Sequence, residues 1–248
     1  MIHLKTEKEI QVMIDGGKIL KEVLDFLLSN TKEGITPKSL DKMAEKKIKS
    51  LGAEPAFKRV SGYKWSTCFS INEEVVHGIP TDYIIKKDDI VGIDCGVYYK
   101  GFNTDSAWSI LVNETMEKRK FLQTGEKALE EAIKQVKIGN HIGHISQAIQ
   151  NIIEKEGYSI VKSLTGHGVG RKLHEAPEIP GILSKPIEMT PKLEIGMVLA
   201  LEVIYNLGSP DVVYKGDDGW TIATKDGKIS GLFEKTVALK RDGVFVLT

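Results

Sequence analysis

The chain has 248 residues, of which 41% are hydrophobic and 27% are charged, a composition that excludes a disordered or fibrous polymer and supplies a large core. Its 34 basic and 34 acidic residues cancel, so no net charge draws the protein toward nucleic acid or an anionic membrane. The two cysteines, Cys68 and Cys95, are too few for a disulfide framework or a four-cysteine zinc site.

The chain begins with two predicted helices. Residues 1–7 lack the apolar core of a signal peptide, and we expect a cytoplasmic protein. Apolar residues then recur close to the period of a helix from Glu7 to Leu28, which predicts an amphipathic helix. A second helix is predicted after Thr36, its N-cap, with Pro37 in the first turn and Gly52 beyond the end.

Short β-branched and aromatic runs follow, and then the whole pattern recurs. The first predicted strands are Thr67–Ile71, Ile90–Asp94, Val97–Tyr99 and Ser106–Val112. Two more amphipathic helices are predicted over Thr115–Val136 and Ile145–Gly157. The strands predicted after them are Ile160–Lys162, Met197–Tyr205, Trp220–Ala223, Leu232–Leu239 and Val244–Leu247. The longest apolar run is far shorter than a membrane span.

Two helices followed by strands, occurring twice, indicate an internally duplicated α+β protein. We expect one domain over residues 1–248, with pseudo-symmetric halves of roughly 1–113 and 114–248. Antiparallel sheets that are covered by helices on one side would bury the apolar faces of both kinds of element.

Two glutamates lie inside apolar strand sequences. Burying an unpaired carboxylate costs several kcal/mol, so Glu202 must be protonated, paired or bound to a cation. Glu234 is more ambiguous, because strand alternation places it on one face with Leu232 and Thr236. A solvated sheet edge would also explain Glu234.

Two aspartates occur at the spacing of a hairpin. Asp94 ends an apolar strand, and Asp105 follows it by eleven residues, after the turn-forming segment Lys100–Thr104. A single aspartate at a strand end is often a cap or turn former. Two strands joined by a turn, however, would bring both carboxylates to the same point.

A histidine stands between two glycines in the segment GHGVGRKLHEAP. Gly166 and Gly168 remove side-chain bulk beside His167 and allow another backbone to approach closely. A phosphate-binding loop is excluded because the glycine spacing differs and because Pro177 and Pro180 prevent a long helix from following.

Four more histidines lie in the body of the chain. His174 follows seven residues after His167, and His77 precedes a glycine; each, taken alone, fits a hydrogen-bonded structural role as well as a functional one. His141 and His144 have the spacing of a metal pair on a helix, but we interpret them as a solvated helix end.

The four carboxylates and the glycine-flanked histidine together suggest a metal centre. Two divalent cations would balance the four negative charges, share a water and hold a carbonyl for attack. Ligands that are mostly oxygen favour Mn, Fe or Co over a metal that prefers thiolates. The candidate ligands are Asp94, Asp105, His167, Glu202 and Glu234.

The order of these five residues, with His77 and His174, resembles the short, type I methionine aminopeptidases over nearly the whole chain. This resemblance implies a duplicated pita-bread fold with a metal site between the two halves. It implies two divalent ions, from among Co, Mn, Fe and Zn. Asp105 and Glu234 would bridge the ions. Asp94 would complete the coordination of one ion, and His167 with Glu202 would complete that of the other.

The same resemblance implies that the enzyme removes the initiator methionine from nascent proteins and peptides, favouring a small second residue. A metal-bound water would attack the first peptide bond, with Glu202 as the proton shuttle. His174 would stabilise the oxyanion, and His77 would align the next residue of the substrate. The free amine of the substrate would lie by the ion that Asp94 holds.

The methionine side chain would lie in a pocket formed by Tyr63, Trp65, Cys68 and Trp220. The aromatic residues among these are alternatively core or lid residues. The sequence also differs from the family pattern, with a short loop before Cys68 and with Leu173 where an aromatic is common. These differences concern the shape of the pocket.

Related families are less compatible with the sequence. Prolidases and aminopeptidase P carry an extra N-terminal domain, and type II methionine aminopeptidases carry an insertion for which the segment between Glu202 and Glu234 is too short. Relatives that have lost catalysis and bind ribosomes or histones lack the ligands. We expect a monomer that associates transiently with ribosomes and binds neither DNA nor membranes.

Overall fold

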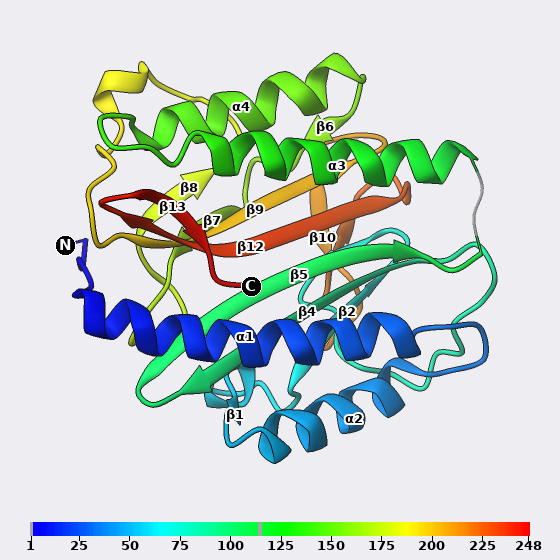
Figure 1. The fold of residues 1–248 in the computed structure, drawn as a ribbon. Coiled ribbons are helices and arrows are strands. Elements are labelled where there is room, and N and C mark those ends of the chain that lie inside the picture. Colours follow the sequence, from blue (N-terminus) through cyan, green and yellow to red (C-terminus); the bar gives the residue numbers. More distant parts are fainter. Residues whose placement is uncertain (1, 114–115) are drawn as a thin grey trace.

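The computed structural model describes residues 2–113 and 116–248 (Figure 1). The helices are α1 (Glu7–Asn30), α2 (Pro37–Ser50), α3 (Met116–Lys134) and α4 (Ile142–Lys155), with short 3-10 turns η1 (Phe57–Arg59) and η2 (Ile187–Met189). The strands are β1 (Glu54–Pro55), β2 (Thr67–Ile71), β3 (Glu74–Val76), β4 (Ile90–Tyr99), β5 (Phe102–Leu111), β6 (Ser159–Ile160), β7 (Thr165–Gly168), β8 (Glu175–Pro180), β9 (Val198–Asn206), β10 (Val212–Tyr214), β11 (Ile222–Thr224), β12 (Ser230–Lys240) and β13 (Gly243–Val246).

Two antiparallel sheets are each packed against two helices. Strand β4 pairs with β1, β2 and β5, and the helices α1 and α2 pack on this sheet through a core that includes Leu27, Ile48 and Ile93. The second sheet has the order β13-β12-β9-β7-β8, with β6 beside β9, and packs against α3 and α4 around Leu129 and Ile149. The arrangement confirms the expected α+β class with antiparallel sheets.

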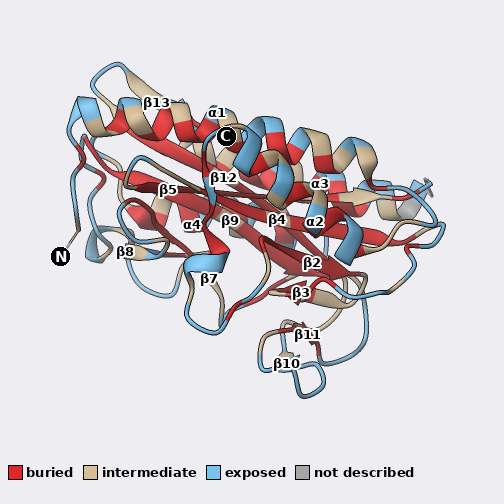
Figure 2. Ribbon diagram, turned by 90° about the horizontal axis from the view of Figure 1, so that it is seen from below, coloured by how far each residue is buried: buried red, intermediate tan, exposed pale blue. Residues whose placement is uncertain are grey.

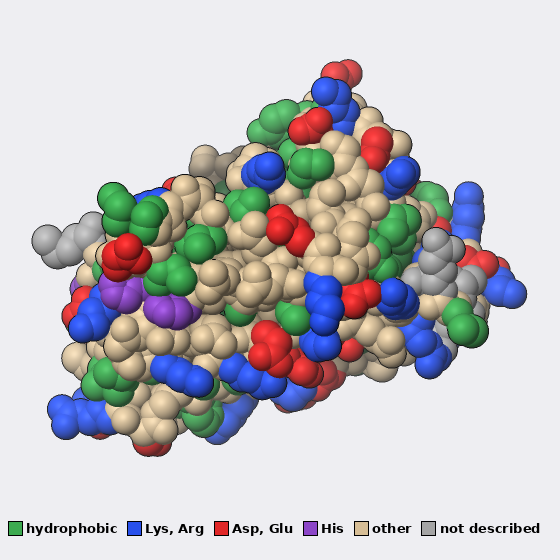
Figure 3. Space-filling view, turned by 90° about the horizontal axis from the view of Figure 1, so that it is seen from above, with side chains coloured by type: hydrophobic (Ala, Val, Ile, Leu, Met, Phe, Trp, Pro, Cys, Tyr) green, Lys and Arg blue, Asp and Glu red, His purple; other side chains and the backbone are tan. Residues whose placement is uncertain are grey.

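A third, small sheet lies apart from the helices. It has the order β10-β11-β3, and Figure 2 shows it projecting on the side of the strands opposite to α1. On the face that Figure 3 shows, basic and acidic side chains are interspersed, in keeping with the zero net charge of the chain. Among the described residues, no helix is both long and apolar enough to cross a membrane.

The two large sheets meet along β5 and β12, which run side by side (Figure 1). Side-chain hydroxyls join these strands: Thr236 Oγ1 donates to the carbonyl of Asp105 at 2.7 Å and accepts from its N–H at 3.0 Å. Ser109 Oγ makes the same pair of contacts with Leu232, at 2.9 and 3.0 Å. These contacts fix the strand that carries Asp105 against the strand that carries Glu234.

The predicted hairpin around the two aspartates is longer than expected. Ile90–Asp94 and Val97–Tyr99, expected as two strands, are parts of the single strand β4. The turn consists of Lys100 and Gly101 alone, whose φ angles of 46° and 95° match a tight two-residue hairpin turn. Strand β5 therefore begins at Phe102 and not at Ser106.

Helix ends also differ from the predictions. The helix α4 begins three residues earlier than expected because His144 caps its start: His144 Nδ1 accepts from the His141 N–H at 3.0 Å. The interpretation of this pair as a helix end is thus confirmed, although the two rings are half-buried. The predicted start of the third helix at Thr115, and the half boundary at residue 114, lie outside the described residues.

Five short strands were absent from the prediction: β1, β3, β7, β8 and β10. The strands β7 and β8 run through the glycine- and proline-rich segments around His167 and Pro177. Glycine and proline are depleted in strands, so residue preference alone indicates a loop there. Tertiary packing overrides this preference.

Candidate metal centre and active site

The first two candidate ligands lie on the hairpin of β4 and β5. Asp94 is opposite Ala107, and Asp105 is opposite Gly96. Residues two apart on a strand share a face, so the two carboxylates are diagonal neighbours on one face of the hairpin. The expectation that a hairpin brings them together is met.

The other three candidate ligands lie on neighbouring strands of the second sheet. Glu202 on β9 is directly opposite Glu234 on β12. His167 on β7 is opposite Ala200, which shares a face with Glu202. The Nε2 atom of His167 lies 3.4 Å from Oε1 of Glu202.

The glycines beside His167 are required by close backbone packing. A Cβ atom on Gly166 would lie 2.5 Å from the carbonyl oxygen of Ala200, and one on Gly168 would overlap the carbonyl of Ala176. Real Cβ atoms essentially never approach so closely, so no other residue fits without a shift of the backbone. The predicted reason for these glycines is confirmed.

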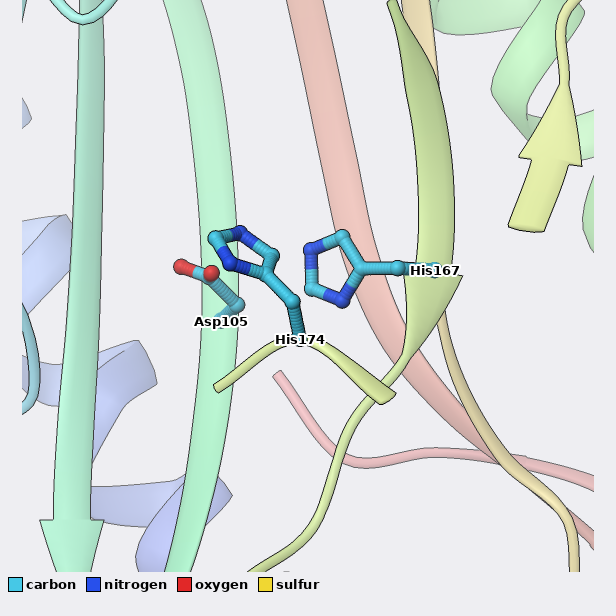
Figure 4. Close-up of side chains that lie close together, drawn as sticks. All are labelled: Asp105, His167 and His174. Carbon is cyan, nitrogen blue, oxygen red and sulfur yellow. The ribbon is translucent and has the colours of Figure 1, made fainter. Parts of the chain in front are cut away.

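All five side chains converge between the two sheets. Ligand atoms of Asp94, Asp105 and Glu234 lie within 4.8 Å of one another, and so do those of His167, Glu202 and Glu234. Glu234 is common to both groups. A third group adds a residue from outside the predicted ligands: the side chains of Asp105, His167 and His174 point toward one another from separate segments (Figure 4).

The donor atoms of this cluster fit divalent metal ions. Asp94 Oδ1 and Glu234 Oε1 are buried, and neither has a hydrogen-bond partner among the described residues. Buried carboxylate oxygens without partners are costly unless a proton or a cation neutralises them. The Nδ1 atom of His167 lies 2.9 Å from the carbonyl oxygen of Gly168, so Nδ1–H donates there and Nε2 is free to bind a metal.

Burial sets the proton affinity of the cluster. It raises the pKa of Asp105 to about 7 and the pKa values of Asp94, Glu202 and Glu234 well above their usual range, with repulsion among the carboxylates adding to the effect for the latter three. Burial lowers the pKa of His167 to about 4, which keeps its imidazole neutral. Glu234 is only 3% exposed, so its explanation as a solvated sheet edge is wrong.

A cavity of about 120 Å³ opens over the five side chains. Of the four expected pocket residues, Tyr63, Cys68 and Trp220 line it among the described residues, whereas Trp65 packs edge-on against Tyr63 with ring centroids 5.2 Å apart. The Trp220 ring stands 5.0 Å from that of Tyr63. The hydroxyl of Tyr63 donates to the Thr67 carbonyl at 2.8 Å, which fixes the tyrosine ring as a wall.

Among the described residues, four further apolar side chains line the cavity: Phe57, Val60, Val76 and Leu173. No sequence pattern marks Phe57, because it lies in a short 3-10 turn without periodicity. Leu173 was identified only as a difference from the family pattern. Together with the aromatic rings, these side chains make one end of the cavity apolar and leave the acidic cluster at the other end.

His77 and His174 stand where the cavity widens into a groove of about 950 Å³. His77 has a φ of 58°, an uncommon conformation for a residue other than glycine. The His174 ring packs edge-on against that of His167, with centroids 4.3 Å apart. Burial lowers the pKa values of both His77 and His174, so both rings are neutral at neutral pH.

Comparison with known proteins agrees with this site. The model of metallopeptidase family M24 matches residues 11–240. A methionine aminopeptidase of Clostridium perfringens is 43% identical over 100% of this chain and 99% of its own length. Methionine aminopeptidase 1 of Bacillus subtilis is 41% identical, with the same coverage.

Solved structures give the same result. The methionine aminopeptidase of Thermotoga maritima has a TM-score of 0.96 and 38% identity, covering 100% of this chain and 99% of that chain. Prolidase from Pyrococcus furiosus, at 23% identity, has a TM-score of 0.80 over 99% of this chain and 65% of its own, and shows the fold alone. The expected pita-bread fold is thus confirmed, and the family together with the acidic cluster indicates a divalent-metal enzyme. The chain belongs to the methionine aminopeptidase family of the M24 metallopeptidases.

Proposed function

We propose that this enzyme removes the N-terminal methionine of nascent proteins and peptides, favouring substrates with a small second residue. The observation that carries the proposal is the cavity, which joins a buried carboxylate–imidazole cluster to a pocket walled by Tyr63, Trp220 and Phe57. A thioether packs favourably against aromatic rings. Family membership supports the same activity.

We assign metal binding to the five clustered residues, which would hold two divalent ions, from among Co, Mn, Fe and Zn. Asp105 and Glu234 would be shared between the ions. Asp94 would complete the coordination of one ion, and His167 with Glu202 would complete that of the other. Such ions supply a water of lowered pKa and polarise a carbonyl. The partnerless oxygens of Asp94 and Glu234 support this assignment.

The remaining roles belong to side chains around the cavity. Glu202 takes a proton from the attacking water and delivers it to the leaving amine. His174, neutral because its pKa is lowered, donates a hydrogen bond to the scissile carbonyl as negative charge develops there. His77 aligns the second residue of the substrate. The free amine of the substrate is recognised at the Asp94 end of the cluster, which restricts cleavage to the first peptide bond.

The expected setting follows from the substrate. Because nascent chains are made in the cytoplasm, we propose that the enzyme acts there, as a monomer in transient contact with ribosomes.

We also propose that residues 1–248 form one catalytic domain whose halves meet near residue 113. Cys68 and Trp65 are assigned to the methionine pocket, Cys68 at its wall and Trp65 behind Tyr63.

A peptide assay tests the proposal. Purified protein is stripped with a chelator, supplied with Mn²⁺ or Co²⁺ under anaerobic conditions, and given Met-Ala-Ser, Met-Leu-Ser and N-acetyl-Met-Ala-Ser. We expect release of free methionine from the first peptide, less from the second, and none from the blocked peptide. Cleavage of the blocked peptide, or no release under any metal, would contradict the proposed function.

A further inference from the structure

A buried ion pair joins the N-terminal segment to the loop that carries His174. The ammonium of Lys5 donates to Oε2 of Glu175 at 2.7 Å, across 170 positions of sequence. The side chains are 1% and 11% exposed. For comparison, the helical surface pair of Lys21 and Asp25 is 58% and 61% exposed. A charge as buried as that of Lys5 is retained at a desolvation cost, and it needs its partner.

The same carboxylate also closes the loop. Oε1 of Glu175 accepts from the backbone N–H of Lys172 at 3.0 Å, so Glu175 is held by Lys5 on one oxygen and holds the loop backbone with the other. Gly170 leaves room for this arrangement: a Cβ there would lie 2.5 Å from Cε of Lys5 and 2.9 Å from Oε1 of Glu175.

Lys5 is itself fixed in place. Its backbone N–H donates at 2.7 Å to the carbonyl of Gly196, two residues before β9, and Thr6 next to it caps α1. The ammonium therefore projects from a segment that is anchored on both sides. The loop that receives it has further supports. Asn103 donates from Nδ2 to the carbonyls of Gly170 and Arg171 at 2.9 and 3.1 Å and from its N–H to that of Gly170 at 2.7 Å, and Arg171 pairs with Glu9 at 2.8 Å.

His174 depends on this loop for its position. It lies in an irregular stretch between Lys172 and Glu175, ahead of strand β8, and the residue as a whole is exposed, although its ring lines the cavity. Figure 4 shows its ring reaching from this loop toward His167 and Asp105. Because the ring is not enclosed by the core, the backbone on either side determines where its nitrogens point.

We propose that Lys5 is a positioning residue for catalysis, acting through Glu175 to hold the His174 imidazole over the reacting carbonyl. This inference rests on the role assigned to His174 in the proposed function. The N-terminal segment then contributes to catalysis, although it is remote in sequence from every candidate metal ligand. Without the ammonium, Glu175 keeps only its bond from the Lys172 N–H and loses its charged partner, and the Lys172–Glu175 turn loosens.

The test combines kinetics with a mutant cycle. Lys5→Met keeps the length and apolar stem of the side chain and removes the charge. Since a shift of about 1 Å in a catalytic group can cost on the order of 100-fold, we expect kcat to fall by roughly 10- to 100-fold with little change in KM. The matched control is Lys8→Met, at an exposed lysine in the first turn of α1, which should leave both constants unchanged.

The decisive measurement is made in a His174→Ala background. If Lys5 acts through His174, Lys5→Met should cause no further loss of kcat there, since the group that it positions is absent. An equal loss in both backgrounds would overturn the proposal, as would an unchanged kcat in Lys5→Met with only a lower Tm. Glu175→Gln, which removes the charge at the other end of the pair and keeps an oxygen that can accept from Lys5, serves if Lys5→Met does not fold.

A readout that does not need activity separates this inference from the proposed function. The imidazole NMR signals of the six histidines are recorded, and His174→Ala assigns the signal of His174. Lys5→Met, but not Lys8→Met, should shift or broaden that signal. If the wild-type enzyme fails to release methionine, the proposed function fails, while an altered His174 signal still supports the positioning role. An unaltered signal would overturn it.

Discussion

At the scale of single residues, the proposed chemistry depends on carboxyl groups whose pKa values are raised by burial, so that folding without metal favours their protonated form. Asp105 illustrates this: it is buried, its pKa is raised to about 7, and its main-chain groups are fixed by Thr236. The backbone thus fixes the residue, while the carboxylate makes a local contact, in which Oδ1 accepts from the Ser106 N–H at 3.1 Å and which an amide oxygen can also make. A change of the carboxylate alone should therefore affect metal binding and spare the fold.

Asp105→Asn tests this separation. Asparagine keeps the size of the side chain and removes the charge that would be shared between two ions. We expect methionine release to be abolished and metal affinity, measured by calorimetry, to fall, while the metal-free protein unfolds at the same temperature or higher because a buried carboxylate is gone. The control Asp82→Asn, at an exposed residue that pairs with Lys38, should match the wild type. Full activity of Asp105→Asn would exclude its bridging role.

How far residues could be predicted depended on the kind of signal. The five candidate ligands could be identified because an acid within an apolar strand, or a histidine between glycines, conflicts with simple folding. Glu234 on its own was ambiguous, since strand alternation says which side chains share a face but not whether another strand covers it. The place of Phe57 in the cavity wall could not be predicted, because the sequence does not distinguish an apolar pocket residue in a short turn from a core residue.

At the scale of elements, contacts from the helix α2 hold the loop that lines the proposed methionine pocket. Asp41 on this helix is buried, and its Oδ1 atom accepts three hydrogen bonds: from Ser66 N–H at 2.8 Å, Thr67 N–H at 3.0 Å and Thr67 Oγ1 at 2.7 Å. These contacts set the position of the segment between Tyr63 and Cys68. The pocket wall is thus tied to a helix on the far side of the sheet.

Asp41→Ala should loosen this wall. Removing a charged acceptor from three buried donors is expected to lower the free energy of unfolding by about 2–4 kcal/mol, measured by urea denaturation. We expect KM for Met-Ala-Ser to rise more than kcat falls, because the change affects the pocket and not the metal cluster. Asp41→Asn is the control: all three bonds reach one oxygen, which an amide oxygen can replace, so most of the stability and affinity should remain. Equal damage in both variants would show that the charge, and not the acceptor, matters.

Element boundaries were predictable only where the signals were local. The start of α2 at Pro37 follows from its N-cap Thr36, and the structure agrees. The start of α4 depends on a histidine pair acting as a cap, a signal outside the usual set of capping residues. The strand β7 forms despite its glycines because the adjacent strands β8 and β9 pair with it on both sides.

At the scale of the whole molecule, the metal cluster lies across the junction of two sheets. Asp94 and Asp105 come from the first sheet, and His167, Glu202 and Glu234 from the second, while hydroxyl bridges between β5 and β12 hold the sheets together. A cation bound by both sets would link the sheets directly. The stability of the entire fold should therefore respond to metal, and the response should depend on pH.

The sign of the pH dependence follows from the pKa shifts. In the metal-free protein the pKa of Asp105 is raised to about 7 and those of the other three carboxyls are raised as well, whereas unfolded carboxyls titrate near 4. The folded state thus binds more protons, and its free energy of unfolding should fall as pH rises from 5.5 to 7.5. Three histidines whose pKa values are lowered, His77, His167 and His174, act in the opposite direction, but they are three groups against four, and their effect ends near pH 6.5, where an unfolded histidine titrates.

Metal should reverse this trend, because cations and protons compete for the same oxygens. We expect Mn²⁺ to raise the Tm more at pH 7.5 than at pH 5.5, and at a free concentration 100 times the Kd the gain should be about 2.7 kcal/mol. The measurement is thermal unfolding of chelator-treated protein with and without Mn²⁺ at both pH values. Glu234→Gln, which removes the carboxylate common to both ligand groups, should lose most of the gain. An equal gain at both pH values, or a gain that persists in Glu234→Gln, would mean that Mn²⁺ stabilises the fold from some other place than the junction of the sheets.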